Sequence, residues 1–575
     1  MKIKIIGSIF LVGWLSVCSF RAVASTVESW WPEQKKPDYI LKCTLSRYND
    51  IREMNLAQSL CGLAAQAVNE GIGEEGVWIE TRVEDYGLYY KAWRKRLKVR
   101  ESGSFDVWSL VKRFKDTGYV RGYVLYDCTR KDNSINAATV QAGILKGVLI
   151  DRTQEEDALR LGLVKLYDAC NVNLDEGWFN QYKSELNNRL IVLANPVAGN
   201  NRDYAIAHKA MVYYGVSPLL HSILEWVRPL SPVIGWNSGP EFQHIEPCSR
   251  WGLINTASDW CMNLPMLSIR GNEKVVKLKS VNPKKIDANE NAVYHSFVMS
   301  DGDNMQWTFG GFVNSPDYWN NMYNGDIPMS FTSCVVNLSM AAPDVLNVLA
   351  ESQPKNVSVV EYGGGYYYPD LFASKRQNAD ELLREFARMV NVHMKKTGVK
   401  TFGFICHKVD SDDALRAYRI FAEELEDVVG MIAVQYVPYN GGHGRVFWVK
   451  DRKNNDIPVL SAKTQIWANL NTEGSGNPSR VAEAINRDVE VCETEGPVLG
   501  WTIVHAWSRF GKNGDKVIDV AANGKKGVRG VTPVYWCKQL LNKKVKVVPV
   551  EELLWRLRMK NDGKPVSERE MVFSK

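Results

Sequence analysis

The sequence lacks several features that would point directly to a function. No two cysteines have the CxxC spacing of a zinc site, and no cluster of histidines and cysteines has metal-ligand spacing. No block of lysine and arginine is dense enough for a nucleic-acid surface, and the formal net charge is only +6. Beyond residue 24, no segment is apolar enough to cross a membrane. We therefore expect no nucleic-acid partner, no membrane span and no cofactor, and the sequence identifies no partner protein.

The N-terminus has the pattern of a secretory signal peptide. Lys2 and Lys4 form a positive region, Ile5–Val17 is an apolar run, and Ala22-Val23-Ala24 supplies a small-x-small cleavage site. Loss of residues 1–24 lowers the formal charge from +6 to +3, because this segment contains three basic residues and no acidic one. We expect the mature protein to be exported, and to be periplasmic or extracellular.

The cysteines allow two further expectations. Lipoprotein anchoring through Cys18 is a less favoured alternative, because the valine before it is bulky for that cleavage site. Export permits disulfides, and Cys248 and Cys261 lie close together in an irregular segment, so they are the best candidates for one. Cys334 and Cys406 lie within apolar strands and resemble small core residues.

The first half of the mature chain is a series of short α/β units. A helical pattern at Asn55–Val68 is followed by a strand at Gly76–Glu80, and similar units continue to the lysine-rich linker Lys274–Lys285. Each unit is too small to form one large core. We predict two or three small α/β modules, with boundaries at residues 25–117, 118–190 and 191–285.

Residues 286–575 have a more regular pattern, in which short apolar strands alternate with helices. Continuous apolar strands of this kind are typical of a parallel sheet that is buried on both faces. No GxGxxG turn lies between a strand and a helix in this half, which counts against an open doubly wound sheet. Eight repeats favour a (β/α)8-type barrel or a distorted relative. The predicted strands are Tyr294–Met299, Met329–Val336, Val357–Glu361, Thr401–Cys406, Met431–Tyr436, Val459–Thr464, Val498–Val504 and Val545–Val548.

Nearly every predicted strand of this half ends in polar or aromatic residues. Ligands bind at the carboxyl ends of the strands in barrels and in open α/β sheets. The chain also contains 19 Trp and 24 Tyr, and such rings can form platforms for ligands as well as core. The predicted substrate-binding residues at these ends and in the nearby loops are Asn304, Asn337, Tyr366, Tyr368, His407, Asp410, Gln435, His443, Arg445, Gln465, Trp467, His505 and Trp507.

Asp301 and Asp303 follow the first of these strands and are separated by one glycine. An extended backbone would point both carboxyls the same way, and two acids in one pocket can take separate acid and base roles. Glu361, at a neighbouring strand end, is the third predicted catalytic residue. An Asp-Gly turn that caps the next helix is the structural alternative. A divalent metal held by Asp301 and Asp303 is a second, weaker alternative.

The segment Gly363–Pro369 carries a recognisable motif. Glycines let the backbone approach a ligand closely, and three tyrosines then offer ring faces and hydroxyls that suit a sugar. Gly363, Gly365, Tyr366, Tyr368 and Pro369 match the five named positions of the GxGYxYP family of putative glycoside hydrolases, which the chain resembles. The runs that extend the resemblance over most of the mature chain are Phe297–Asn304, Arg202–Ala205 and Ser231–Trp236.

The leading interpretation is an exported glycoside hydrolase. Such enzymes use two carboxyl groups, one as acid and one as nucleophile or base. Strand-end chemistry assigns Glu361 as the proton donor and Asp301 or Asp303 as its partner. The first alternative is a metal-dependent polysaccharide deacetylase or esterase that adds His407 or His505 as a ligand. The second is a non-catalytic glycan-binding protein.

Overall fold

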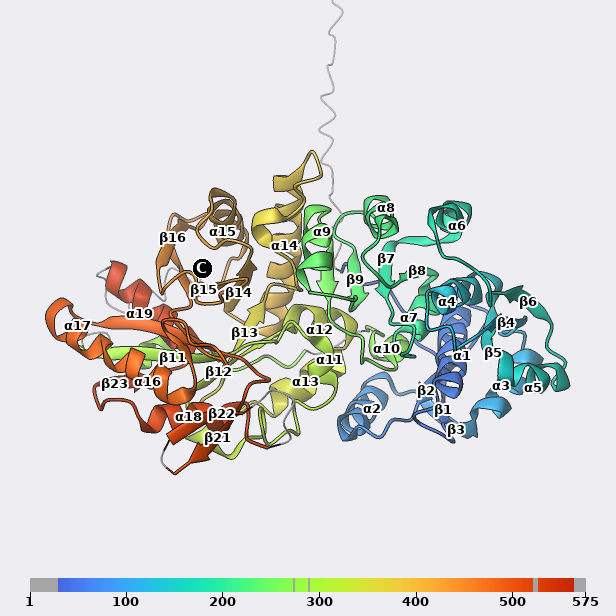
Figure 1. The fold of residues 1–575 in the computed structure, drawn as a ribbon, viewed down its shortest axis with the longest axis horizontal. Coiled ribbons are helices and arrows are strands. Elements are labelled where there is room, and N and C mark those ends of the chain that lie inside the picture. The colour runs from blue at the N-terminus through green and yellow to red at the C-terminus, as the bar shows by residue number, and fades with distance from the viewer. Residues whose placement is uncertain (1–28, 272–274, 288–289, 515, 521–525, 563–575) are drawn as a thin grey trace, which may run out of the picture.

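The computed structural model describes residues 29–271, 275–287, 290–514, 516–520 and 526–562 (Figure 1). The predicted signal peptide, residues 1–24, and Cys18 lie outside the described residues. No helix within the described ranges is long and apolar enough to cross a membrane.

Three small parallel sheets form the N-terminal half of the molecule. Their orders are β2-β1-β3, β5-β4-β6 and β10-β9-β7-β8. The boundary predicted at residue 190 falls within β7 of the third sheet. The strands are β1 (Tyr39–Thr44), β2 (Glu75–Ile79), β3 (Arg100–Asp106), β4 (Gly122–Tyr126), β5 (Gly147–Asp151), β6 (Lys165–Asp168), β7 (Asn187–Leu193), β8 (Ala210–Tyr213), β9 (Pro232–Gly235) and β10 (Ile254–Thr256).

The helices α3, α4, α7 and α10 of this half pack against α1, which is buried over most of its length. Asp50 caps its first turn by accepting the Arg52 N–H, and Gly71 ends it in the left-handed conformation. A Cβ at Gly62 would lie 2.6 Å from the Asp203 carbonyl oxygen, so glycine lets α7 cross closely. The helices are α1 (Ile51–Glu70), α2 (Glu84–Leu97), α3 (Val107–Asp116), α4 (Ser134–Leu145), α5 (Glu155–Arg160), α6 (Glu176–Tyr182), α7 (Arg202–His208), α8 (Pro218–Trp226), α9 (Phe242–Arg250) and α10 (Leu264–Leu267).

The C-terminal half contains one curled sheet with the order β16-β17-β15-β14-β13-β12-β11-β20-β18-β19. All neighbouring pairs are parallel except β16 with β17. The strands are β11 (Val293–Met299), β12 (Met329–Ser333), β13 (Ser358–Tyr362), β14 (Thr401–Cys406), β15 (Gly430–Gln435), β16 (Val446–Lys450), β17 (Asp456–Ser461), β18 (Thr464–Ile466), β19 (Ser475–Gly476) and β20 (Val498–Val504).

This sheet differs from the predicted (β/α)8 barrel at two places. The predicted sixth strand is divided at Ala462 and Lys463, so that β17 pairs with β15 whereas β18 pairs with β20. The predicted eighth strand, β23 (Val545–Val547), lies beside β11 and does not close the sheet between β20 and β11, because these two strands pair directly over seven residues. The fold is therefore mixed α/β with a curled sheet, so the predicted α/β class is confirmed but a closed (β/α)8 barrel is not.

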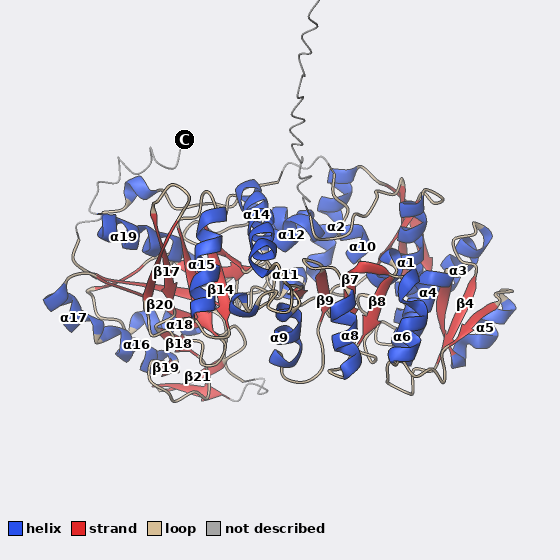
Figure 2. Cartoon of the chain, turned by 90° about the horizontal axis from the view of Figure 1, so that it is seen from above, coloured by secondary structure: helices blue, strands red, loops and turns tan. Residues whose placement is uncertain are grey.

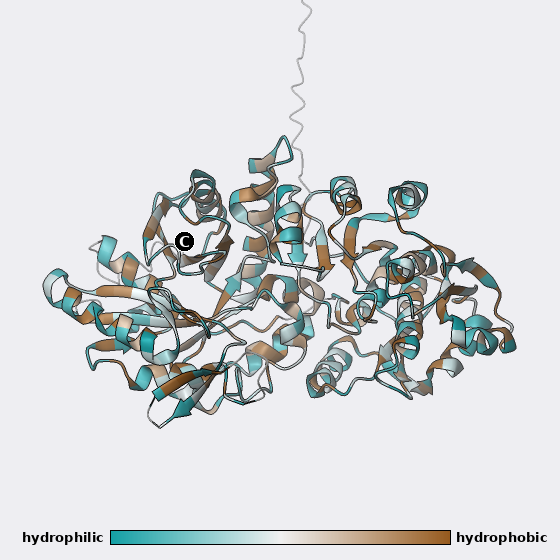
Figure 3. Ribbon diagram, in the orientation of Figure 1, coloured by the Kyte–Doolittle hydropathy of each residue, from teal (hydrophilic) through white to brown (hydrophobic). Residues whose placement is uncertain are grey.

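Helices cover the outside of the curled sheet, and a small hairpin, β21 (Arg509–Asn513) and β22 (Lys516–Val520), lies next to it (Figures 1 and 2). Hydrophobic residues concentrate on the strands (Figure 3). The helices are α11 (Met305–Phe309), α12 (Val335–Ala341), α13 (Pro343–Glu351), α14 (Ala379–Thr397), α15 (Asp412–Glu424), α16 (Pro478–Asn486), α17 (Asp488–Glu495), α18 (Val531–Gln539) and α19 (Val550–Asp562).

The interior of the curled sheet is a packed core rather than a pore. Alternate residues of each strand point inward, so Tyr294 and Val298 of β11 pack with Trp501 and Ile503 of β20. Leu554 of α19 belongs to the same core, and α19 contacts β11, β15, β17 and β20. The Val550 N–H donates to the Ser330 hydroxyl at the start of β12, and Arg558 donates to the Val429 carbonyl just before β15. The helix α19 therefore covers the amino end of the sheet.

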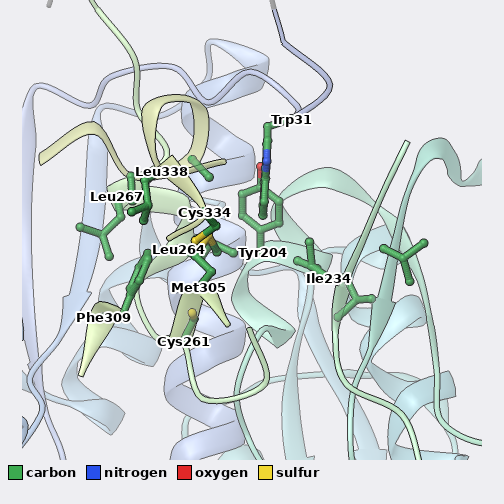
Figure 4. Close-up of a cluster of buried hydrophobic side chains, with 14 of the residues drawn as sticks. Trp31, Tyr204, Ile234, Cys261, Leu264, Leu267, Met305, Phe309, Cys334 and Leu338 are labelled. Atoms are coloured by element: carbon green, nitrogen blue, oxygen red, sulfur yellow. The ribbon is translucent and has the colours of Figure 1, made fainter. Parts of the chain in front are cut away.

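A second core joins the curled sheet to the small modules (Figure 4). Trp31 and Tyr204 pack there at a ring-centroid distance of 5.9 Å, close to Met305 and Cys334 of the C-terminal half. Cys261, in the same cluster, and Cys248 are both free thiols, so the predicted disulfide between them was wrong. The shared core fixes the third module against the carboxyl end of the curled sheet.

Candidate active site

A cavity of about 320 Å³ lies at the carboxyl end of the curled sheet, where the third module meets it. Its size is at the lower end of the range for small-molecule sites. Two lining residues come from the third module, and the others follow the strands of the C-terminal half. The lining residues are Trp236, Glu241, Ser300, Asp301, Asp303, Asn304, Tyr362, Tyr366, Ile405, Val437, Tyr439, Trp467 and His505.

The turn that holds Asp301 and Asp303 depends on Gly302. A Cβ at Gly302 would lie 2.0 Å from the Thr332 carbonyl carbon and oxygen, so only glycine fits against β12. The Gly302 N–H donates to the Thr332 hydroxyl at 2.9 Å, and that hydroxyl donates to the Met299 carbonyl at 2.8 Å. Asp301 itself has a φ of +68°. This turn brings both carboxyls to one cavity.

Asp301 is held by several hydrogen-bond donors. The Trp507 indole N–H donates to its Oδ1 at 3.0 Å, and the Ser300 hydroxyl donates to its Oδ2. The Ala506 N–H lies 3.5 Å from the same Oδ2. Donors of this kind stabilise a carboxylate charge and fix the direction of its lone pairs. Asp301 is therefore arranged to act as an anion at the cavity wall.

Asp303 has a very different environment. It is only 5% exposed, and within the described ranges no other residue donates a hydrogen bond to its carboxyl group. Burial, followed by the charges of Asp301 and Glu241, raises its pKa well above the usual value. Asp303 is thus a buried acid whose lone pairs are free for a ligand.

Glu241 faces these two acids from the third module. It immediately precedes α9 and follows the turn after β9. Burial and the charge of Asp301 raise its pKa to about 7, against the opposing effect of the Tyr436 and Tyr366 hydroxyls. A carboxyl group with this pKa carries a proton over much of the neutral range, which suits a general acid. The sequence analysis missed Glu241, although the rule that sites follow strand ends also applies to β9.

Aromatic rings form two walls of the cavity. The His505 ring stacks on Trp467 at a centroid distance of 3.7 Å, and Trp467 stacks on Tyr439 at 5.0 Å. Burial lowers the pKa of His505, and the charge of Asp301 partly offsets this effect. A second stacked pair in the lining is Trp236 and Tyr366, at 6.1 Å. Flat rings beside carboxyl groups are suited to the apolar faces and polar edges of a sugar.

The glycine–tyrosine segment, Gly363–Pro369, is the contact between the two parts of the site. A Cβ at Gly365 would lie 2.4 Å from Ile254 Cγ2 and 2.9 Å from the Asn255 carbonyl oxygen, so glycine allows the close approach to β10. The Tyr366 N–H then donates to that carbonyl at 2.7 Å. This contact aims Tyr366 into the cavity, where its buried hydroxyl lies near Glu241 but makes no hydrogen bond of normal length to a described residue.

Two protein-family models match the sequence of the chain. Residues 291–558 match the GxGYxYP putative glycoside hydrolase C-terminal domain, and residues 188–269 match the GxGYxYP third domain. The chain belongs to the GxGYxYP family. The resemblance noted in the sequence is thereby confirmed, and the cavity lies between the two matched domains.

A solved structure has the same fold as this GxGYxYP protein. It is the crystal structure of a putative hydrolase from Bacteroides thetaiotaomicron, with 19% sequence identity and a TM-score of 0.76. The similarity covers 92% of this chain and 97% of that one, so it includes the small modules as well as the curled sheet. No curated protein matches the chain.

The structure of this GxGYxYP protein places Glu361 outside the cavity, contrary to the sequence analysis. Glu361 is fully buried, and its two oxygens accept the Val336 N–H at 2.7 Å and the Gly364 N–H at 2.8 Å. It therefore joins the start of α12 to the glycine turn. The predicted pairing of Glu361 with Asp301 across a substrate has no geometric support.

Asn337 is also a structural residue in this arrangement. It is fully buried, and its Oδ1 accepts the indole N–H groups of Trp30 at 3.1 Å and Trp31 at 2.8 Å. Its Nδ2 donates to the Gly364 carbonyl at 2.8 Å. Its amide thus ties the N-terminal segment to the glycine turn and does not reach the cavity.

The other predicted binding residues divide into two groups. Asn304, Tyr366, Trp467 and His505 line the cavity, and Trp507 contacts it through Asp301. Gln465 is buried against Asn440 and Ser475, and Asp410 and Arg445 form an ion pair of 2.8 Å. The predicted residues outside the lining of the cavity, as far as the chain is described, are Asn337, Tyr368, His407, Asp410, Gln435, His443, Arg445 and Gln465.

The acids of the site are not arranged as a metal centre. Within the described ranges, no group of three or more His, Cys, Asp or Glu side chains is placed to hold a metal ion. Asp301 and Asp303 share the cavity with His505. A hydrogen bond of 2.8 Å joins Nδ1 of this histidine to the Ser508 hydroxyl, and its ring stacks flat on Trp467.

Proposed function

We propose that this GxGYxYP protein is an exported glycoside hydrolase in which Glu241 is the general acid and Asp301 is the nucleophile or base. The observation that carries the proposal is the pair of carboxyls facing one cavity, one with a pKa of about 7 and the other held by donors. Glycoside hydrolysis needs two such groups with opposite protonation states. The pattern of residues 1–24 supports export to the periplasm or beyond the cell.

The proposed reaction assigns one task to each group. Glu241 donates its proton to the glycosidic oxygen as the bond from that oxygen to the anomeric carbon breaks. The Asp301 carboxylate either attacks the anomeric carbon or removes a proton from the water that attacks it. Trp507 positions Asp301 through the 3.0 Å hydrogen bond, and the rings of Trp467 and Tyr366 bind the sugar on opposite sides.

Release of reducing ends from a panel of plant and mucosal glycans tests the activity. Glu241→Gln and Asp301→Asn should each lower turnover by about 10²–10⁴-fold without loss of folded protein. Glu246→Gln is the matched control, because Glu246 lies on α9 outside the cavity and pairs with Arg250 at 2.9 Å. Wild-type rates in both site variants would falsify the assignment.

Substrates with different leaving groups distinguish the acid role of Glu241 from the nucleophile or base role of Asp301. An aryl glycoside with an acidic phenol needs little protonation, so Glu241→Gln should retain most activity on it and lose activity on an alkyl glycoside. Asp301→Asn should lose activity on both substrates, because its task does not depend on the leaving group. Equal losses on both substrates in Glu241→Gln would show that Glu241 is not the acid. Glycan binding without hydrolysis by the wild type would favour a glycan-binding protein instead.

A further inference from the structure

The cavity is strongly acidic although the chain as a whole has a net charge of +6. Three of its lining residues are carboxylic acids, and no lysine or arginine lines it among the residues that the structure describes. Arg529 lies beside the site, but its guanidinium is over the Trp507 ring and pairs with Asp317 at 2.8 Å. Among the described residues, His505 is therefore the one basic side chain in the lining of the cavity, and burial lowers its pKa and so disfavours its charged form.

The proposed hydrolysis uses only two of the three acids. Asp303 is left over, 5% exposed and without a donor from another described residue. A buried carboxyl group without hydrogen bonds costs free energy unless a ligand satisfies it. The hydroxyl of Tyr366, which is 3% exposed, is a second unsatisfied polar group in the same cavity. The Asp303 carboxyl and the Tyr366 hydroxyl could therefore both form hydrogen bonds to a ligand in the cavity.

An ammonium group fits this pair better than a hydroxyl or an acid does. It carries three N–H donors and the positive charge that the cavity lacks. A sugar hydroxyl could donate one hydrogen bond, but it brings no positive charge to favour the ionised form of Asp303. A uronate or sulfate would bring a further negative charge against three acids, at a high cost in a partly desolvated cavity.

We propose that Asp303 recognises a cationic amino group on the sugar, so that the substrates are glycans with free, unacetylated amino sugars. This inference rests on the proposed function, because it assigns the acid that the hydrolysis does not use. The amino group contacts Asp303 and the Tyr366 hydroxyl, while Glu241 and Asp301 remain available at the glycosidic bond. Asp303 is thus a specificity residue rather than a third member of the acid–base pair.

Binding of monosaccharides tests this without any need for catalysis. Calorimetry on the full mature protein would compare glucosamine and galactosamine with their N-acetyl, neutral and uronic counterparts, in EDTA to remove bridging metal ions. We expect the matching amino sugar to bind about tenfold or more tightly than its neutral counterpart. Uronic acids should show no binding. Equal affinity for the amino and neutral sugars would overturn the inference.

The substitution Asp303→Asn keeps the shape of the side chain and prevents it from becoming a carboxylate when a cation binds. It should abolish the preference for the amino sugar and leave binding of the neutral sugar unchanged or stronger. Asp259→Asn is the matched control, because Asp259 is a partly buried acid that does not line the cavity. A preference that persists in Asp303→Asn would refute the role of this residue.

The two proposals can fail separately. Preferential binding of the amino sugar together with no hydrolysis of any glycan would refute the hydrolase and support the ammonium site. Hydrolysis of neutral glycans by the wild type, with no preference for amino sugars in binding, would refute the ammonium site and support the hydrolase.

Discussion

Two turns that follow parallel strands meet at the site, and they contribute in different ways. The first turn follows β13, whose end contains Glu361, and it consists of the glycine–tyrosine segment that gives the family its name. The turn after β9 contains Trp236 and Glu241 and has no conspicuous motif. The carboxyl group of the first region is used internally, since Glu361 accepts two backbone N–H groups. The second turn instead leaves a carboxyl group facing the cavity.

The comparison teaches that a conspicuous motif can build an interface rather than perform the chemistry. Gly365 allows β10 to approach, and Asn337 and Glu361 hold the turn in shape. These three residues place Tyr366 at the cavity and fix the third module against the curled sheet. Chemistry then needs a group that is not already satisfied, and Glu241 is such a group.

Replacement of each glutamate by glutamine should distinguish the catalytic role of one turn from the structural role of the other. This comparison has the largest expected effect. Glu241→Gln should reduce turnover by about 10²–10⁴-fold with no loss of thermal stability. Glu361→Gln should lower the free energy of unfolding by about 1–3 kcal/mol, because an amide N–H₂ replaces one acceptor of a buried N–H. Turnover and Tm of both proteins are measured together. A Glu361→Gln protein of normal Tm and no activity would reverse the two assignments.

Gly365→Ala tests whether the motif builds the interface. The added Cβ would clash with Ile254 and the Asn255 carbonyl, and a φ of +142° is unfavourable for alanine. We expect a loss of stability of about 1–3 kcal/mol and a higher KM, because Tyr366 moves away from the cavity. Thermal unfolding and steady-state kinetics measure these effects. Gly311→Ala controls for positive φ alone, since nothing lies within 4 Å of its Cβ position. Equal effects in the two variants would mean that the contact with β10 is unimportant.

The pH dependence of activity should report Glu241 directly. Its acid role requires the protonated form, so kcat/KM should fall as the pH rises through about 7. In Glu241→Gln, the residual kcat/KM should no longer fall on the alkaline side of the pH profile. A pH–rate profile of both proteins from pH 4 to pH 9 is the measurement. An alkaline limb that is unchanged in the variant would assign it to another group.

The sequence predicted the frame of the site better than its chemistry, for physical reasons. Strands buried on both faces appear as continuous apolar runs, so seven of the eight predicted segments coincide with strands that follow one another around the sheet, although the sixth is divided. The position of β23 could not be predicted, because a three-residue strand has no preference for a neighbour apart from tertiary packing. The division of the sixth strand at Ala462 likewise depends on hydrogen bonds to two different neighbours.

The error over Glu361 has a simple origin. Successive side chains of a strand point to opposite faces, and Tyr362 of β13 points into the interior and lines the cavity. Glu361, one residue earlier, must therefore point to the other face. Glu241 was missed because it belongs to a different module, and only the packing of that module on the curled sheet brings it beside Asp301.

The smallest expected effect is on stability, and it tests whether Glu241 is held in an unfavourable environment for its charge. Its pKa is about 7 in the folded protein and near 4.5 when unfolded, so the folded state binds more protons between these values. The stability that the folded protein gains from keeping Glu241 protonated is complete below pH 4.5, and it is lost as the pH rises through 7. Glu241→Gln lacks this loss, so it should match the wild type at pH 4.5 and exceed it at pH 8 by up to about 3 kcal/mol. Tm values of both proteins at the two pH values are the measurement, with Glu246→Gln as the control. A Glu241→Gln protein less stable than the wild type at pH 8 would show that this carboxyl, like that of Glu361, is satisfied by the fold.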